Sequence, residues 1–237
     1  MFARLLAPFV DLLAPSRCPA CDTQGLTLPG LCPACAEGLV PLGPSCPTCA
    51  RPVEGPRSLT CRACRHAAPR FDRLVAPWRY GGPVAEAMCR FKYGGPDGRG
   101  RPELATALAA LLVPALPALT ADLCVPVPAD PVRLLRRGFS PPLELARALG
   151  VARPGRLVPR LLARRPRPEQ ASLDAEARRR NVWGMFRVPR PADVDGRHIL
   201  VLDDVATTGA TAREAAATLM NAGAARVTVL VLARAEA

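Results

Sequence analysis

LVLDDVATTGAT, residues 200–211, is the stretch that decides the fold of this chain. Two adjacent acids, Asp203 and Asp204, end a run of four apolar residues, which is typical of a buried strand. Small and hydroxylic residues follow, and a helical pattern begins at Thr211 and closes at Gly223. Open α/β sheets bind ligands where the carboxyl end of a strand leads into the next helix. The stretch therefore predicts a ligand site on such a sheet.

The rest of the chain beyond about residue 70 alternates in the same way. We expect helices at 83–93, 140–150, 211–223 and the first half of 102–119, and strands at 73–80, 122–128, 198–204 and 225–234. Strands that alternate with helices predict parallel βαβ units. The predicted fold class is therefore α/β, with a doubly wound, mainly parallel sheet.

The residue types in the opening stretch predict its chemistry. A turn whose backbone amides converge at a helix N-terminus binds phosphate, and the residues of this predicted turn are Ala206, Thr207, Thr208, Gly209, Ala210 and Thr211. The carboxylates of Asp203 and Asp204 would repel that phosphate, so their natural partners are vicinal hydroxyls or a hydrated Mg²⁺. A phosphate beside a diol describes a ribose 5-phosphate.

Eight of the ten cysteines form four Cys-x-x-Cys pairs near the N-terminus: Cys18/Cys21, Cys32/Cys35, Cys46/Cys49 and Cys61/Cys64. Two such pairs complete a tetrahedral four-sulfur site, the usual arrangement of structural zinc, so we expect two zinc ions. The pairs combine either in sequence order or in a cross-braced manner, and the spacing does not decide between them. A closed site leaves no position for water, so the zinc is expected to replace a hydrophobic core rather than to catalyse.

The net charge of +12 is concentrated in one part of the chain. Residues 131–190 carry fifteen Arg against four acidic residues, a local net charge of +11. Such a segment is either a solvated arginine-rich face or a contact for an anionic partner such as a polyphosphate, a nucleic acid or an acidic membrane. Lys92 is the single lysine beside thirty-one arginines.

Three parts of the chain are expected: an amphipathic helix at 1–17, a double zinc ribbon at 18–66 and a larger α/β domain at 70–237. The helix has apolar residues on one face, and its apolar stretch is interrupted by Pro8 and Asp11 without a cleavage site, so we do not expect a secretory signal. The sequence has no apolar run of about 18 residues that would span a membrane. We expect a cytoplasmic protein.

The opening stretch resembles the phosphoribosyl pyrophosphate (PRPP) loop of type I phosphoribosyltransferases. With the four cysteine pairs, the chain resembles the ComF family, also called the amidophosphoribosyltransferase-like or double-zinc-ribbon phosphoribosyltransferase family. The resemblance covers nearly the whole chain, and its other pieces are FKYGG (91–95), VPVP (125–128), RRGF (136–139) and the set Gln170, Leu173, Arg178, Asn181 and Phe186. It implies a type I phosphoribosyltransferase-like domain behind a small zinc-ribbon domain.

The resemblance also implies roles for individual residues. Asp203 and Asp204 would be the catalytic acids that bind the ribose hydroxyls, residues 206–211 would bind the 5-phosphate, and Mg²⁺ would accompany PRPP. The pyrophosphate ligands implied are Lys92, Val127, Pro128, Arg136, Arg137 and Arg178. Arginine suits this role because its planar fork binds phosphate oxygens bidentately.

Three functions remain open from the sequence. The first is a transferase or hydrolase that displaces pyrophosphate from PRPP, and the second is a module that binds PRPP without turnover. The third follows from the association of the family with natural competence. It is a cytoplasmic factor that handles internalised single-stranded DNA, with a competence helicase as its partner. No residue stands out as a base for an acceptor, and we expect His198, which opens a buried strand, to be structural.

Overall fold

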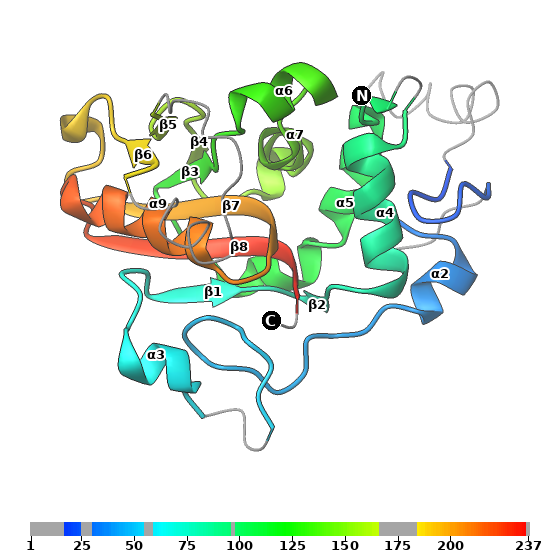
Figure 1. The fold of residues 1–237 in the computed structure, drawn as a ribbon, viewed down its shortest axis with the longest axis horizontal. Coiled ribbons are helices and arrows are strands. Elements are labelled where there is room, and N and C mark those ends of the chain that lie inside the picture. Colours follow the sequence, from blue (N-terminus) through cyan, green and yellow to red (C-terminus); the bar gives the residue numbers. More distant parts are fainter. Residues whose placement is uncertain (1–16, 25–29, 55–58, 96–97, 166–183, 236–237) are drawn as a thin grey trace, which may run out of the picture.

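The computed structural model describes residues 17–24, 30–54, 59–95, 98–165 and 184–235 of the 237-residue chain. Its centre is a parallel sheet with the strand order β1-β8-β7-β3-β4, and β2 also pairs with β8 (Figure 1). These strands are β1 (Arg73–Val75), β2 (Trp78–Arg79), β3 (Leu123–Pro126), β4 (Arg156–Leu157), β7 (His198–Ala206) and β8 (Arg226–Arg234). The predicted parallel α/β fold is confirmed.

The two central strands are the longest, with nine residues each. They pair in register from His198 opposite Arg226 to Ala206 opposite Arg234. Most of their residues are buried on both faces, which explains why the two strands are nearly continuous apolar runs in the sequence. The prediction ended the first of them at Asp204, but the strand continues to Ala206 because its last residues still pair with β8.

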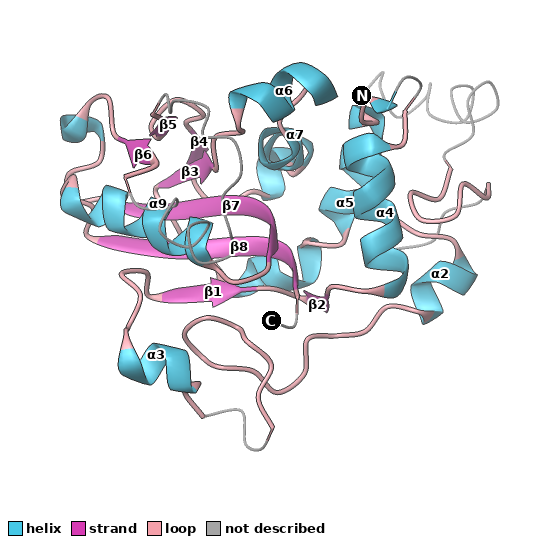
Figure 2. Ribbon diagram, in the orientation of Figure 1, coloured by secondary structure: helices cyan, strands magenta, loops and turns pink. Residues whose placement is uncertain are grey.

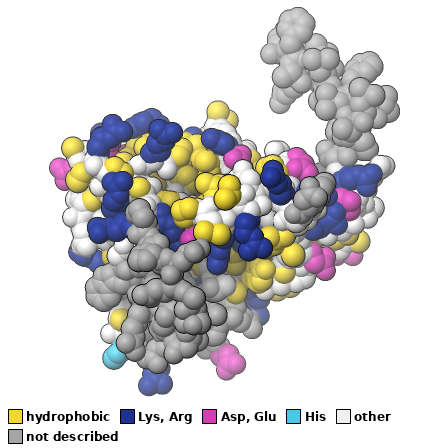
Figure 3. Space-filling view, turned by 45° about the horizontal axis from the view of Figure 1, so that its top comes forward, with side chains coloured by type: hydrophobic (Ala, Val, Ile, Leu, Met, Phe, Trp, Pro, Cys, Tyr) yellow, Lys and Arg dark blue, Asp and Glu magenta, His cyan; other side chains and the backbone are white. Residues whose placement is uncertain are grey.

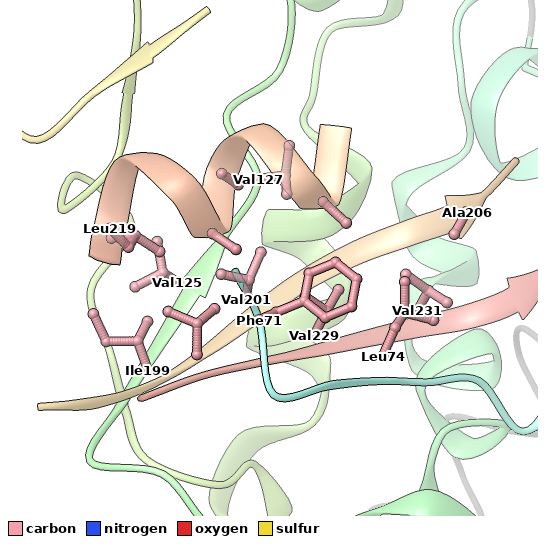
Figure 4. Packing of buried hydrophobic residues seen from close by; sticks show 14 of the residues in the cluster. Phe71, Leu74, Val125, Val127, Ile199, Val201, Ala206, Leu219, Val229 and Val231 are labelled. Atoms are coloured by element: carbon pink, nitrogen blue, oxygen red, sulfur yellow. The ribbon is translucent and has the colours of Figure 1, made fainter. Parts of the chain in front are cut away.

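Helices cover both faces of the sheet (Figure 2). One face carries α9 (Ala210–Asn221) and the other carries α4 (Gly82–Tyr93), α5 (Ala105–Ala110) and α7 (Pro141–Ala148). Successive side chains of a strand point to opposite faces. Val201 therefore packs with Phe71 and Leu219 on the α9 side (Figure 4), whereas Leu200 and Leu202 pack with the helices of the other face.

Some elements differ from the predicted ones, and proline accounts for two of the differences. The predicted strand 73–80 is split into β1 and β2, with Pro77, which has no N–H for the ladder, between them. The segment 102–119 divides into η2 (Pro102–Leu104), α5 and η3 (Val113–Ala118), because its prolines limit the α-helix. The predicted helix 140–150 ends at Ala148, and η4 (Gly150–Ala152) follows.

Further elements were not expected from the sequence. α6 (Pro131–Arg137) begins with a proline after Asp130, whose side chain caps it by accepting a hydrogen bond from the Arg133 N–H. β5 (Ala163–Arg164) and β6 (Phe186–Arg187) form a small antiparallel pair, and η5 (Pro191–Asp193) precedes β7. The signal for α6, a capping acid followed by proline, was present in the sequence.

The cysteine-rich segment, with α2 (Pro33–Glu37) and α3 (Arg62–His66), contributes to both sides of the core. Cys18 and Cys32 pack in the cluster that contains α4, α5 and α7, whereas Cys46 and Cys64 pack in the cluster on the α9 side. The two halves of the ribbon segment therefore belong to opposite faces of the sheet. The predicted helix 1–17 lies outside the described residues except for its last residue. None of the described helices is long and apolar enough to cross a membrane.

Candidate functional site: a cavity at the carboxyl ends of the strands

A cavity of about 350 Å³ lies where β3 and β7 end, with residues of α4, α6, α7 and α9 around it. Its volume suits a small-molecule ligand. The cavity is lined by Tyr80, Lys92, Tyr93, Val127, Pro128, Ala129, Asp130, Arg133, Arg137, Pro141, Pro142, Arg164, Asp203, Asp204, Val205, Thr207 and Thr211. A smaller hollow of about 40 Å³ adjoins Asp203 and residues 205–212. The carboxyl end of a parallel sheet is therefore the candidate site, as predicted.

Asp203 and Asp204 lie on the last part of β7 and both line the cavity. Lys92 Nζ, at the end of α4, lies 2.8 Å from Asp204 Oδ2. The two side chains are only 20% and 14% exposed, so the ion pair is largely shielded from water. Backbone amides hold both acids: the Asp204 N–H donates to Asp203 Oδ1 at 2.9 Å, and the Val205 N–H donates to Asp204 Oδ1 at 2.6 Å.

The Asp203 carboxyl has an unusual proton affinity. Burial, together with the negative charge of Asp204, raises the pKa of Asp203 to about 7, although Lys92 acts in the opposite direction. Desolvation and a neighbouring like charge both disfavour the ionised form. A cation bound between the two acids would reverse this effect, so the pair is chemically suited to a divalent metal ion.

The turn between β7 and α9 consists of residues 207–209, which we call the β7–α9 turn. Gly209 is the N-cap of α9 with φ of 77°, in the left-handed region that favours glycine. Thr208 Oγ1 accepts a hydrogen bond from the Ala210 N–H at 3.3 Å. Thr207 and Thr208 are exposed beside the N-terminus of a twelve-residue helix, whose partial positive charge favours an anion.

One member of the predicted turn lies elsewhere. Ala206 is buried in β7, where its carbonyl oxygen accepts hydrogen bonds from the Ala235 N–H at 2.9 Å and from Arg234 Nη1 at 2.8 Å. Its position results from the extra pairing of β7 with β8. Ala206 still borders the smaller hollow, as do Thr207, Thr208, Gly209, Ala210 and Thr211.

The predicted pyrophosphate ligands divide into three groups. Lys92, Val127, Pro128 and Arg137 line the cavity. Arg136 is exposed on α6 and is not among the lining residues, because it precedes Arg137 by one position and so projects from a different face of the helix. Arg178 lies outside the described residues.

Arg137 is the buried cation of the site. Its Nε donates to the Lys92 carbonyl oxygen at 3.1 Å, its Nη2 donates to Tyr93 Oη at 2.9 Å, and its guanidinium carbon lies 4.8 Å from the centre of the Tyr93 ring. These contacts join the end of α6, where Arg137 lies, to the end of α4. They fix the end of α4, and with it Lys92, beside the acids.

The sequence reasoning missed two cations, Arg133 and Arg164, which line the same cavity. Arg133 lies four residues before Arg137 on α6, so a helix predicted there would have placed both on one face. Arg164 Nη2 lies 3.3 Å from Asp130 Oδ2, which fixes the loop after β3. No local signal marks Arg164, because β5 reaches the site only through the tertiary fold.

Two motifs of the family resemblance contact each other. Phe91 of FKYGG and Phe139 of RRGF are buried, with ring centroids 5.0 Å apart. Gly138 between Arg137 and Phe139 has φ of 89°, which turns the chain at the end of α6. The aromatic pair thus brings Lys92 and Arg137 to the same cavity.

His198 lies at the opposite end of β7, where its ring contacts Thr228, and it does not line the cavity.

The cysteines combine in sequence order. The first centre (Cys18, Cys21, Cys32 and Cys35) and the second centre (Cys46, Cys49, Cys61 and Cys64) each place their four sulfur atoms within 4.8 Å of one another. Of the two pairings that the spacing left open, the structure has the sequential one.

The sulfur geometry of both centres fits zinc. The Cys21 and Cys32 sulfurs are 3.6 Å apart, as are those of Cys49 and Cys61. Tetrahedral zinc with Zn–S bonds of about 2.3 Å requires sulfurs roughly 3.8 Å apart. Cys89 and Cys124 belong to neither centre.

Comparison with known proteins agrees with this architecture. Residues 9–65 match the double zinc ribbon domain and residues 134–237 match the phosphoribosyl transferase domain. The DNA utilization protein YhgH of Salmonella typhi is 35% identical over 193 residues, which cover 76% of this chain and 80% of that protein. YhgH of Escherichia coli K12 is 34% identical over 189 residues, covering 74% and 78%.

Solved structures give a more distant likeness. Glutamine PRPP amidotransferase from B. subtilis, complexed with ADP and GMP, is 20% identical, with a TM-score of 0.40 over 61% of this chain and 30% of that one. The sequence relatives and the two domain matches are the stronger finding. With its two four-cysteine centres and its parallel α/β domain, this chain belongs to the ComF family of double-zinc-ribbon, phosphoribosyltransferase-like proteins, the family of YhgH.

Proposed function

We propose that the protein binds PRPP, or a related ribose 5-phosphate ligand, together with Mg²⁺ in the 350 Å³ cavity, and that it transfers or hydrolyses the phosphoribosyl group. One observation carries the proposal. The paired acids at the end of β7 and the N-terminus of α9 border the same cavity, so a diol and a phosphate of one ligand would each find a partner.

Each part of the ligand has its own group of residues in this proposal. Asp203 and Asp204 would accept hydrogen bonds from the ribose hydroxyls, and residues 206–211 would bind the 5-phosphate. Arg133, Arg137 and Arg164, with the loop after β3, would bind the pyrophosphate. Lys92, which lines the cavity and pairs with Asp204, would add positive charge for the pyrophosphate, and Asp203 and Asp204 would hold Mg²⁺, which would supply the counter-charge for the two acids.

The chemical step requires charge stabilisation more than a general base. A nucleophile forms a bond to the anomeric carbon while the bond from that carbon to the pyrophosphate oxygen breaks, and the electron pair leaves with pyrophosphate. Mg²⁺, when bound, would supply positive charge for this leaving group. Cationic side chains held in place by the fold stabilise the same charge, and the two acids orient the electron-poor sugar.

The relatives that match this chain are named DNA utilization proteins, which supports a second role. We propose that the protein also binds single-stranded DNA through the basic segment 131–190, in the cytoplasm and with a competence helicase as partner. Arg133 and Arg136 are exposed on α6, and Lys and Arg side chains are more widespread than acidic ones on the face in Figure 3. A PRPP cavity and a DNA-binding face are compatible functions of one chain.

Calorimetric titration with PRPP and Mg²⁺ tests the first role. Wild-type protein should bind, and Asp204→Asn should bind at least tenfold more weakly, since it loses an acceptor and a metal ligand. Pyrophosphate release that depends on Mg²⁺ and disappears in Asp204→Asn would show an enzyme, whereas binding without release would show a binding module. Absence of binding in the wild-type protein would refute the proposal.

The DNA-binding role has a separate test. The affinity for single-stranded oligonucleotides should fall steeply with salt concentration, since released counterions drive such binding. Affinity that does not respond to salt would refute this role without affecting the first.

A further inference from the structure

Arg234, the last residue of β8, is buried with only 1% of its surface exposed and makes an unusual set of contacts. Its Nε donates to the carbonyl oxygen of Cys49 at 3.2 Å. Its Nη1 donates to the carbonyl oxygens of Ala206 at 2.8 Å, Thr207, and Ala235 at 3.3 Å. One guanidinium therefore joins the backbone of a metal-ligand residue to the start of the β7–α9 turn.

The charge of this guanidinium also indicates a link between Arg234 and the second centre. Among the described residues Arg234 forms no ion pair with a carboxylate, and a buried charge is costly without an opposite charge. Four thiolates around one divalent zinc ion carry a net charge of about −2. The loaded second centre, which Arg234 contacts through Cys49, is thus the natural counter-charge of Arg234.

A second arginine attaches the start of α9 to the same centre. Arg213 Nη2 donates to Cys64 Sγ at 3.4 Å, and its Nη1 donates to the Ala67 carbonyl oxygen at 2.8 Å. The Arg213 N–H also donates to the Gly209 carbonyl oxygen at 3.0 Å. The β7–α9 turn is therefore held at both ends by arginines that reach the second centre.

The first centre has different attachments. Asp22, beside Cys21, accepts hydrogen bonds from Arg101 at 3.1 Å and pairs with Arg90 of α4 at 2.8 Å. These contacts lead toward α4 and residues 101–103 on the other face of the sheet. The chain thus offers an internal control, a second cysteine centre with its own arginine tether that leads away from the β7–α9 turn.

We propose that Arg234 is a positioning residue that couples the second metal centre to the β7–α9 turn, so that loss of the metal loosens the phosphate-binding end of the cavity. The assignment of phosphate to this turn rests on the proposed function, whereas the coupling itself does not. Coupling is reciprocal, so ligand bound at the turn retains the metal of the second centre and leaves that of the first unaffected.

Hydrogen exchange measured by mass spectrometry on the full-length, zinc-loaded protein tests the coupling without a ligand. Chelator is added in steps, and peptides over 46–64 and 18–35 report which centre has opened. A peptide over 203–213 reports the turn. In wild-type protein, opening of the second centre should speed exchange at 203–213 by about tenfold or more, the factor expected for losing one hydrogen bond to a charged group.

Arg234→Lys keeps the charge but cannot span the four carbonyl groups that the guanidinium of Arg234 contacts. Its 203–213 peptide should exchange fast before any chelator is added and should no longer respond to opening of the second centre. Arg101→Lys, which alters the tether of the first centre, should behave as wild type at 203–213. Unchanged exchange at 203–213 after the second centre has opened would overturn the proposal, and so would Arg234→Lys behaving as wild type.

Two further measurements keep the test decisive. If Arg234→Lys does not fold, the wild-type chelation series still decides, with a peptide over β3 as reference, and an equal rise there would count against a specific role of Arg234. The second measurement is calorimetry with ribose 5-phosphate as the ligand. If opening of the second centre speeds exchange at 203–213 but the protein binds no ribose 5-phosphate, the proposed function is refuted and the role of Arg234 is not.

Discussion

Lys92 and Asp204, 112 positions apart in the chain, form a 2.8 Å ion pair at the centre of the candidate site. The pair joins the end of α4 to the end of β7 and is largely shielded from water. It holds the only lysine of the chain beside the two acids. In the proposed function, the same two residues would engage the Mg²⁺–PRPP complex.

Lys92→Met should lower the free energy of unfolding by about 1–3 kcal/mol, between the values for exposed and buried ion pairs. The reason is that Asp203 and Asp204 would lose their nearby cation. Urea unfolding at pH 8 measures the change. Arg147→Met is the control, because Arg147 is 58% exposed in its 2.8 Å pair with Glu144, and the variant should cost about 0.5 kcal/mol or less. Equal losses in the two variants would contradict a special role for the Lys92 pair.

Asp203→Asn should stabilise the protein above pH 7. The folded chain keeps a proton on Asp203 up to a pKa of about 7, whereas an ordinary aspartate loses it near 3.8. Between these values the folded state binds more protons, so the contribution of Asp203 to the free energy of unfolding falls as pH rises. The variant should gain on the order of 1–3 kcal/mol at high pH and little near pH 4. Urea unfolding across this range measures the difference, and a gain independent of pH would contradict it.

The affinity for ligand should rise with pH because of Asp203, whereas the contribution of Asp203 to stability falls with pH. Mg²⁺ requires the ionised carboxylate, so the affinity for PRPP with Mg²⁺ should rise as pH passes upward through about 7 in wild-type protein. Calorimetry on either side of this pH measures the step. Asp203→Asn should bind more weakly and show no step from this group. A step of equal size in the variant would assign it to another residue.

Gly209→Ala should cost about 1–2 kcal/mol of stability, because φ of 77° is unfavourable for a residue with a Cβ atom. The added Cβ meets only Arg234 Nη2 at 4.0 Å, so strain rather than a clash is expected. Gly196→Ala has a similar φ of 66°, open space around its Cβ and a position at the other end of β7. Both variants should lose similar stability in thermal unfolding, but only Gly209→Ala should weaken ribose 5-phosphate binding. Equal affinities would place the phosphate elsewhere.

Arg133→Ala and Arg136→Ala separate the cavity from the outer basic face of α6. Arg133 lines the cavity and Arg136 does not, although both are exposed residues of the same helix. Arg133→Ala should weaken pyrophosphate binding by about tenfold or more, the effect of one charge-assisted hydrogen bond. Arg136→Ala should leave pyrophosphate binding unchanged and weaken only the binding of single-stranded DNA. Calorimetry with pyrophosphate and oligonucleotide titrations measure the two effects, and the reverse pattern would contradict the assignment.

Zinc analysis after denaturation should find two ions per chain, one for each sequential set of cysteines. Cys61→Ser should reduce the number to one and destabilise the α9 side of the sheet, where the second centre packs. Cys32→Ser is the counterpart at the first centre and should affect the α4 side instead. Loss of both ions in either variant would contradict two independent centres.

Local patterns predicted the main elements well. The apolar runs at 198–204 and 225–234 and the helix before Gly223 needed only periodicity and end signals, and each is present within two residues of its expected bounds. The errors arose where local signals compete. Pro77 lies between β1 and β2, and α6 went unnoticed although Asp130 and Pro131 mark its start.

The candidate site was predictable in its local part and not in its assembly. The acids and the β7–α9 turn are neighbours in sequence, so one motif placed them together. The cations come from distant segments, which is why the predicted ligand Arg136 does not line the cavity, whereas Arg133 and Arg164, which were not predicted, do. Helix orientation and strand pairing decide which guanidinium reaches the cavity.

The sequence by itself determined the parallel α/β class, the acids beside a phosphate-type turn and the four cysteine pairs, because each depends on periodicity or spacing within a short window. Only the tertiary structure decided that the cysteines combine sequentially, that Lys92 pairs with Asp204, and that Arg234 links the second centre to the β7–α9 turn. These contacts join residues on different elements, and their partners are chosen by how helices and strands pack, which no local pattern encodes.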